Sequence, residues 1–207
     1  MTAPPPSPLD AAVALHREGK HELAMQRYVA ILQQEPRNAD ALYYVAVLAV
    51  QQQQYDEGLR VIARALEVGA PQARLFNLKG QVHLRRNEDA DALEAFSRAI
   101  EADASFVDAY GNRGTLLAEM GRLTEALADY ERALALRPDN PEDIGNRAGL
   151  LADLGRFDEA LAGFDRAISL LPEFAPAYFN AKICCASFVN RNLTNVSATS
   201  VVPCLSE

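Results

Sequence analysis

The sequence repeats itself every 34 residues, and this period constrains the fold more than any other feature. The stretch that begins at Tyr110 aligns without a gap with the stretch that begins at Ile144, an offset of 144 − 110 = 34 residues. The same step in both directions recovers five repeats with no insertion. Repeats of this size stack on their neighbours, because no single repeat buries its apolar face alone. The sequence therefore predicts a stacked array.

Columns of equivalent residues keep their chemistry from repeat to repeat. Two columns hold small residues: Ala12, Ala46, Gly80, Gly114 and Ala148, and Ala24, Gly58, Ala92, Ala126 and Ala160. A third column holds large apolar side chains: Tyr28, Ile62, Phe96, Tyr130 and Phe164. Small residues let two helices approach closely, and the large side chains fill the space beside them. We expect Ala24, Tyr28, Phe96, Tyr130 and Phe164 to be buried between helices.

Each repeat holds two helical stretches of about a dozen residues, each about 20 Å long. Apolar residues recur at helical spacing within them, as at Leu123 and Leu127. Glycines stand where the chain must turn between the two stretches, namely Gly19, Gly121 and Gly155. Ser7, followed by Pro8 and Asp10, has the pattern of a helix start, and Asn140 before Pro141 repeats it.

These columns closely resemble the tetratricopeptide repeat, in period and in residue identity, from about Pro5 to Pro172. The resemblance implies an all-α, right-handed α-solenoid of five helical hairpins plus a C-terminal helix. It divides the chain into a flexible Pro-rich N-terminus (1–6), five repeats (7–174), a capping helix (175–188) and a disordered tail (189–207). Departures are local: Gln53 and Asn87 replace the turn glycine, and Arg113 and Arg147 replace a usual leucine.

The resemblance also implies that the first helix of each repeat lines a concave groove. The helical register then predicts the peptide-binding residues Tyr43, Tyr44, Val47, Asn77, Gln81, Asn112, Asn146 and Asn180. A tyrosine offers contact area and a polar tip, so this pair can anchor an apolar side chain of a partner. The alternative is that one of the two tyrosines packs between helices.

Three of these asparagines recur at the repeat interval, at Asn112, Asn146 and Asn180. An amide donates and accepts hydrogen bonds, so such a row can pair with an extended peptide backbone without reading its sequence. The row resembles the asparagine ladder in the N-terminal superhelix of bacterial O-linked N-acetylglucosamine transferase-like proteins. The alternative is that asparagine is simply common in this column of tetratricopeptide repeats.

The leading prediction is a protein–protein interaction scaffold that binds an extended peptide or a partner helix in the concave groove. The alternative is the substrate-recognition part of an O-linked N-acetylglucosamine transferase-like glycosyltransferase that lacks its catalytic domain. A comparison with the chaperone-docking members of the family fails. Some chaperone-docking repeats grip a C-terminal carboxylate with cations, and Glu142 stands here where a cation is needed.

Composition argues against several other classes. The net charge of −8, with basic and acidic residues interleaved, disfavours nucleic-acid binding. No apolar run is long enough to span a membrane, and no secretory signal is visible, so we expect a cytoplasmic protein. The histidines at positions 16, 21 and 83 are scattered, and His16 and His21 are interpreted as solvated hairpin residues. No catalytic residue, metal site or cofactor is predicted, and the protein is not expected to be an enzyme.

The repeat pattern ends after Ala181, and few charges follow. One more amphipathic helix is expected over about Ala175–Phe188, where it would cover the last hairpin. Apolar side chains that remain exposed on it predict a weak homodimer through this helix. The abrupt change suggests a chain that stops early or changes reading frame. The three cysteines, Cys184, Cys185 and Cys204, lie in this region and lack metal-site spacing.

Overall fold

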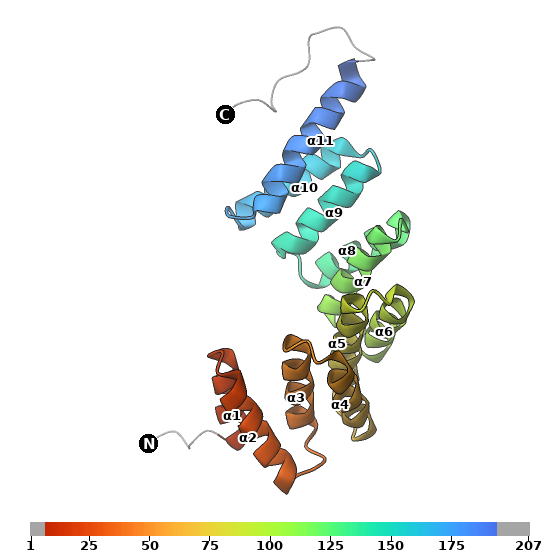
Figure 1. Cartoon of the computed structure of the whole chain (residues 1–207). Coiled ribbons are helices and arrows are strands. Elements are labelled where there is room, and N and C mark those ends of the chain that lie inside the picture. The colour runs from red at the N-terminus through yellow and green to blue at the C-terminus, as the bar shows by residue number, and fades with distance from the viewer. Residues whose placement is uncertain (1–6, 194–207) are drawn as a thin grey trace. The chain divides into compact units, whose positions relative to one another are not determined.

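The computed structural model describes residues 7–193. Within this range the regular structure consists of eleven helices and no strand (Figure 1). Their bounds are α1 (Pro8–Arg17), α2 (His21–Gln34), α3 (Ala39–Gln51), α4 (Tyr55–Glu67), α5 (Gln72–Arg85), α6 (Asp89–Ala102), α7 (Val107–Glu119), α8 (Leu123–Leu136), α9 (Pro141–Asp153), α10 (Phe157–Leu170) and α11 (Ala175–Leu193). The fold is all-α and is built from repeated helical hairpins, as the sequence predicted.

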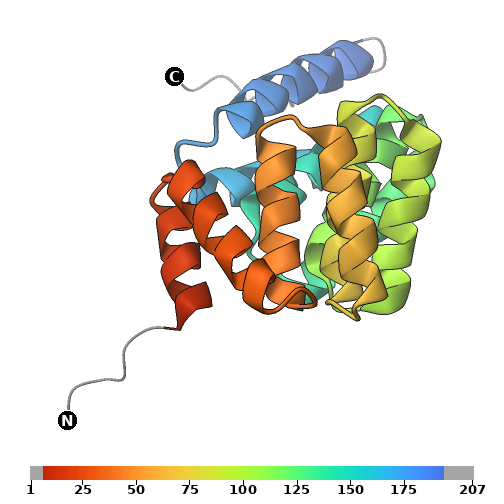
Figure 2. The same ribbon diagram turned by 60° about the horizontal axis from the view of Figure 1, so that its bottom comes forward.

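The chain divides into two compact halves, Met1–Ala109 and Tyr110–Glu207, and the boundary falls within α7. In the N-terminal half the hairpins are α1/α2, α3/α4 and α5/α6, drawn from red to yellow-green in Figure 1. The second helices of the first two hairpins also pack on the first helix of the next hairpin, α2 on α3 and α4 on α5. Figure 2 shows the same antiparallel pairs from another side. The apolar faces are therefore buried between neighbours, as expected for an array.

In the C-terminal half, α9 and α10 form a hairpin, α8 packs on α9, and α11 packs on both α10 and α9. Helix α11 begins at the predicted Ala175 but ends at Leu193, five residues beyond Phe188. The sequence offers a reason, because no proline or glycine occurs between Pro176 and Pro203 to end the helix earlier. Residues 194–207, which make up the rest of the expected tail, lie outside the described residues.

The repeat columns occupy the positions predicted for them. Ala24, Tyr28, Phe96 and Phe164 are fully buried, and Tyr130 is almost so. The small column explains how the helices come so close: a Cβ atom on Gly80 would lie 2.5 Å from a ring carbon of Phe96. Each large side chain therefore fills the space that the small column opens.

The turns and helix starts are also confirmed. Gly19, Gly121 and Gly155 have φ values of 74°, 74° and 75°, in the left-handed region that favours glycine. Gln53 and Asn87 adopt the same conformation, with φ of 61° and 59°, so the turn keeps its shape where glycine is replaced. Two predicted caps form as well, through the side chains of Ser7 and Asn140.

The unusual arginine of α7 has a partner that sequence inspection did not identify. Arg113 donates from two guanidinium nitrogens to the two carboxylate oxygens of Asp129 on α8, both at 2.7 Å. Asp129 is buried, and its hydrogen bond raises the pKa of Arg113. The paired charges take the place of the usual apolar contact.

The burial of the large column predicts the stability of one variant. Phe164→Ala should lower the free energy of unfolding by about 3–5 kcal/mol, because it leaves a cavity in a closely packed site. Phe179→Ala is the matched control, since that side chain is 66% exposed. Urea denaturation followed by circular dichroism measures both, and equal effects of the two variants would contradict the assigned core.

Candidate functional site

The first helices of the first two repeats enclose a hollow in the N-terminal half. Its volume is about 320 Å³. It is lined from α1 and α3 by Leu9, Asp10, Val13, Ala14, Arg17, Asp40 and Tyr44. We call it the N-terminal hollow. It combines apolar side chains, an aromatic ring and both signs of charge, the composition expected of a recognition surface.

The two helices that line the hollow run in the same direction. The Nε2 atom of His16, in the last turn of α1, lies 3.1 Å from the Oε1 atom of Gln51, the last residue of α3. Asp10 and Asp40 stand in the first turns of the same two helices. The carboxylates therefore lie toward one end of the hollow and Arg17 toward the other.

Tyr44 lines the N-terminal hollow, and the rings of Tyr28, Tyr43 and His16 pack around it; we call this cluster the aromatic wall. The ring of Tyr44 stacks on that of Tyr28, with centroids 5.4 Å apart and planes inclined by 6°. Tyr43 meets Tyr44 edge to face at 5.3 Å, and His16 meets it in the same way at 6.1 Å. Tyr28 is fully buried while Tyr44 is half-buried, so the inner ring supports the outer one. Such a supported ring is a firm contact surface for a ligand.

Burial raises the pKa of two phenols of this wall, whose ordinary value of about 10 already leaves them neutral at pH 7. It raises the pKa of Tyr28 to about 12, helped by the neighbouring Tyr44 and opposed by the Arg17 guanidinium. It also raises the pKa of Tyr43, which the guanidinium of Arg74 partly offsets. At neutral pH both groups are hydrogen-bonding hydroxyls. The formal charges lining the hollow are therefore those of Asp10, Asp40 and Arg17.

Two of the predicted binding residues, Tyr43 and Tyr44, meet in this aromatic wall, and Val47 follows them half-buried on α3. The predicted binding residues include none from the first repeat, although the same helical register places residues of that repeat in the groove. Subtracting the period of 34 from positions 43, 44, 47 and 51 gives Leu9, Asp10, Val13 and Arg17, all of which line the hollow.

The interpretation of His16 as a solvated residue is wrong. It is half-buried, lies 3.5 Å from the hydroxyl of Tyr28, and packs its ring against Tyr44. His21 adds a ring contact to His16, with centroids 5.5 Å apart. These contacts place His16 in support of the aromatic wall.

The predicted amides differ in exposure. In the N-terminal half Asn77 is buried in α5, while Gln81 is exposed one turn later. In the C-terminal half Asn112 is half-buried on α7, and Asn146 on α9 and Asn180 on α11 are exposed. The exposed amides are accessible to a ligand backbone, whereas burial leaves little of Asn77 for a ligand.

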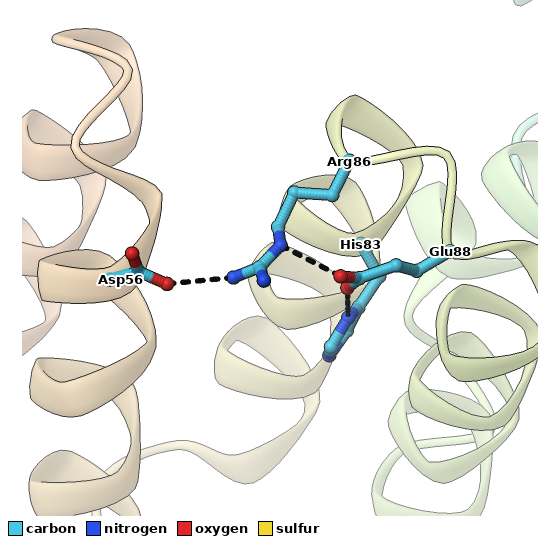
Figure 3. A network of polar contacts seen from close by, with 4 residues as sticks. All are labelled: Asp56, His83, Arg86 and Glu88. Carbon is cyan, nitrogen blue, oxygen red and sulfur yellow. Dashed lines mark hydrogen bonds and ion pairs between the residues drawn. The ribbon is translucent and has the colours of Figure 1, made fainter.

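A second polar cluster lies at the turn of the third hairpin (Figure 3). Glu88 accepts from His83 Nδ1 at 2.6 Å and from Arg86 Nε at 2.8 Å, and Arg86 also donates to Asp56 on α4 at 2.8 Å. Asp91 brings a third atom of the kind that binds metals, a carboxylate oxygen within 4.8 Å of the ring nitrogen of His83 and the carboxylate oxygen of Glu88. The guanidinium beside Glu88 repels a metal cation, so the cluster suits an ion-pair network that ties the second hairpin to the third.

Family models for the tetratricopeptide repeat match residues 15–82 and 107–140. The chain therefore carries tetratricopeptide repeats. A comparison with curated proteins gives no match. Within residues 7–193, no helix is long and apolar enough to cross a membrane.

Solved structures support the same fold. The chain is similar to YrrB, described as a TPR protein with an unusual peptide-binding site, at 25% identity and a TM-score of 0.64, covering 84% of this chain and 90% of that one. It is also similar to pilF of Pseudomonas aeruginosa, at 18% identity and a TM-score of 0.80, covering 90% and 85%. A third is a thermophilic TPR protein of Thermus thermophilus, at 22% identity and a TM-score of 0.66, covering 86% and 97%.

The ion-pair network of Figure 3 predicts a pH-dependent stability. The hydrogen bond from His83, followed by the charge of Arg86, lowers the pKa of Glu88. A carboxyl whose pKa is lower when folded stabilises the protein above its unfolded value, about 4.3, and loses that effect as the pH falls through the folded value. Glu88→Gln should therefore lower the melting temperature at pH 7, and the difference from wild type should vanish in acid.

Thermal unfolding followed by circular dichroism between pH 7 and pH 3 measures this difference. Glu101→Gln, an exposed change on α6, is the control. A Glu88→Gln variant that melts with wild type at pH 7 would show that the network contributes nothing.

Proposed function

We propose that the protein is an interaction scaffold, without catalytic activity of its own, that binds an extended peptide segment of a partner protein in the N-terminal hollow. The observation that carries the proposal is the hollow itself, with its apolar side chains, stacked aromatic wall and charged ends between α1 and α3. Tetratricopeptide repeats typically mediate protein–protein interaction. The peptide-binding site named for YrrB supports the same use of this fold.

The form of the hollow favours a peptide. It lies between two parallel helices, and the half-buried Tyr43 and Val47 stand beside Tyr44 on α3. A peptide side chain can enter against Val13 and Tyr44 while the flanking residues follow the helices. The hydroxyls of the half-buried Tyr43 and Tyr44 can hydrogen-bond to peptide groups. Aromatic anchors of this kind supply much of the energy of protein interfaces.

For the C-terminal half we propose that Asn112, Asn146 and Asn180 hydrogen-bond to a peptide backbone. Their support is the shared register and the accessibility of the last two. The glycosyltransferase alternative stays a hypothesis that rests on this asparagine row alone. A cytoplasmic location likewise stays a prediction from the sequence.

The proposed peptide binding can be tested by substitution. A partner captured with the whole chain supplies the peptide, whose affinity is then measured by fluorescence polarisation. Tyr44→Ala should weaken binding about tenfold or more, as expected for an aromatic hot spot. Asn112→Ala should weaken it less. Tyr55→Ala, a tyrosine on the second helix of its hairpin, is the control. Unchanged affinity of the Tyr44→Ala, Asn112→Ala double variant would remove both surfaces from the proposed function.

We also propose a weak homodimer through α11. Three apolar side chains of this helix are exposed: Tyr178 at 44%, Phe179 at 66% and Ile183 at 50%. Ala177 and Cys184 of the same helix are buried, so one face packs on the last hairpin and another faces solvent. Two copies could bury these solvent-facing residues against each other in an isologous contact.

Sedimentation velocity over a hundredfold concentration range tests the dimer. The wild-type sedimentation coefficient should rise with concentration, while that of Phe179→Asp should stay at the monomer value, because the charge cannot be buried unpaired. Glu173→Gln, just before α11, is the control. A wild-type protein that stays monomeric throughout would show that α11 serves only to cover its own hairpin.

A further inference from the structure

The N-terminal hollow carries opposite charges at its two ends. Asp40 is exposed in the first turn of α3, at the end where Asp10 also lies. One oxygen of Asp10 is already occupied, because it accepts from the backbone nitrogen and the hydroxyl of Ser7 at 3.2 and 2.7 Å. Asp40 is therefore the main carboxylate for a ligand. At the other end, Arg17 is exposed in the last turn of α1.

Between these ends the lining is apolar and aromatic. Leu9, Val13 and Ala14 come from α1, and Tyr44 presents its ring from α3. Tyr44 is held by its stacking on the buried Tyr28, so its position does not depend on a ligand. The hollow thus offers an acidic end, an apolar middle and a basic end, in that order along the helices.

We propose that the N-terminal hollow selects extended peptide segments in which an apolar residue lies between one basic and one acidic residue. This inference rests on the proposed function and adds the chemistry of the ligand. The basic residue pairs with Asp40, the apolar side chain packs against Val13 and Tyr44, and the acidic residue pairs with Arg17.

The geometry sets the spacing of the two charged residues. Asp40 stands eleven positions before Gln51 on α3 (51 − 40 = 11), and Gln51 lies beside the end of α1 that carries Arg17. At 1.5 Å per residue this is about 16 Å along the helix. An extended chain covers that distance in about five residues. The ligand should therefore carry its opposite charges about five positions apart.

Charge matching of this kind acts mainly on specificity. Exposed ion pairs add little affinity, but a misplaced like charge is rejected. A segment with acidic residues at both positions is repelled by Asp40, and a segment with basic residues at both positions is repelled by Arg17. The hollow is thereby distinguished from a site that accepts any acidic or any basic tail.

The experiment uses the whole chain and five fluorescein-labelled peptides with blocked ends. Each peptide has a leucine between two variable positions that lie five residues apart, in a glycine–serine background. The variable pairs are arginine then glutamate, glutamate then arginine, two arginines, two glutamates, and two glutamines. At low ionic strength, one of the two mixed orders should bind about tenfold more tightly than the other four peptides.

Two variants test which end of the hollow recognises the acidic residue of the peptide and which recognises the basic one. Arg17→Gln should remove the preference for glutamate over glutamine and keep the preference for arginine. Asp40→Asn should do the reverse. Arg37→Gln, an exposed arginine between α2 and α3, should leave both preferences in place.

Charge selection and peptide binding can be distinguished by their results. If all five peptides bind the wild type equally, or if each variant weakens all peptides alike, charge selection is overturned and peptide binding in the hollow stands. If no peptide binds, the hollow is not a peptide site, and both proposals fall.

Discussion

The close approach of two helices within each hairpin is the constraint on which the rest of the structure depends. A Cβ atom on Gly80 would lie 2.5 Å from the ring of Phe96, and one on Gly114 would lie 3.3 Å from the ring of Tyr130. The helices can be this close only because one column is small and the facing column is large. The spacing is kept from hairpin to hairpin, so residues 34 positions apart take equivalent places.

That regularity is why the fold could be predicted from the sequence and why parts of the site could not. The turn glycines, the caps and the buried column follow from local chemistry repeated five times. The pairing of Arg113 with Asp129 breaks the column pattern, and its partner lies on another helix, 16 residues away. Likewise, Tyr28 belongs to the buried column, so nothing in the sequence showed that it would support Tyr44 beneath a hollow. Leu9 and Arg17 could have been predicted from the period of 34 residues, because they occupy the same repeat positions as Tyr43 and Gln51.

Fold and recognition use separate positions of the same repeat. The packing columns stay small or large throughout, whereas one exposed register position reads Arg17, Gln51, Arg85, Glu119 and Asp153. Its charge passes from basic to acidic along the chain while the helices that carry it keep their packing. The hairpin thus fixes where a side chain stands and leaves its chemistry open, so a binding preference can change with little effect on stability.

The gathering of aromatic residues at the hollow has an optical consequence. The chain contains no tryptophan and seven tyrosines, so tyrosine dominates its intrinsic ultraviolet emission. Three of those seven, Tyr28, Tyr43 and Tyr44, meet in the aromatic wall. A large share of the emitting groups therefore lies where a ligand would dock. A bound peptide that carries a tryptophan would receive excitation energy from these rings. Peptide binding could therefore be measured from the fluorescence of the native residues, without an attached dye.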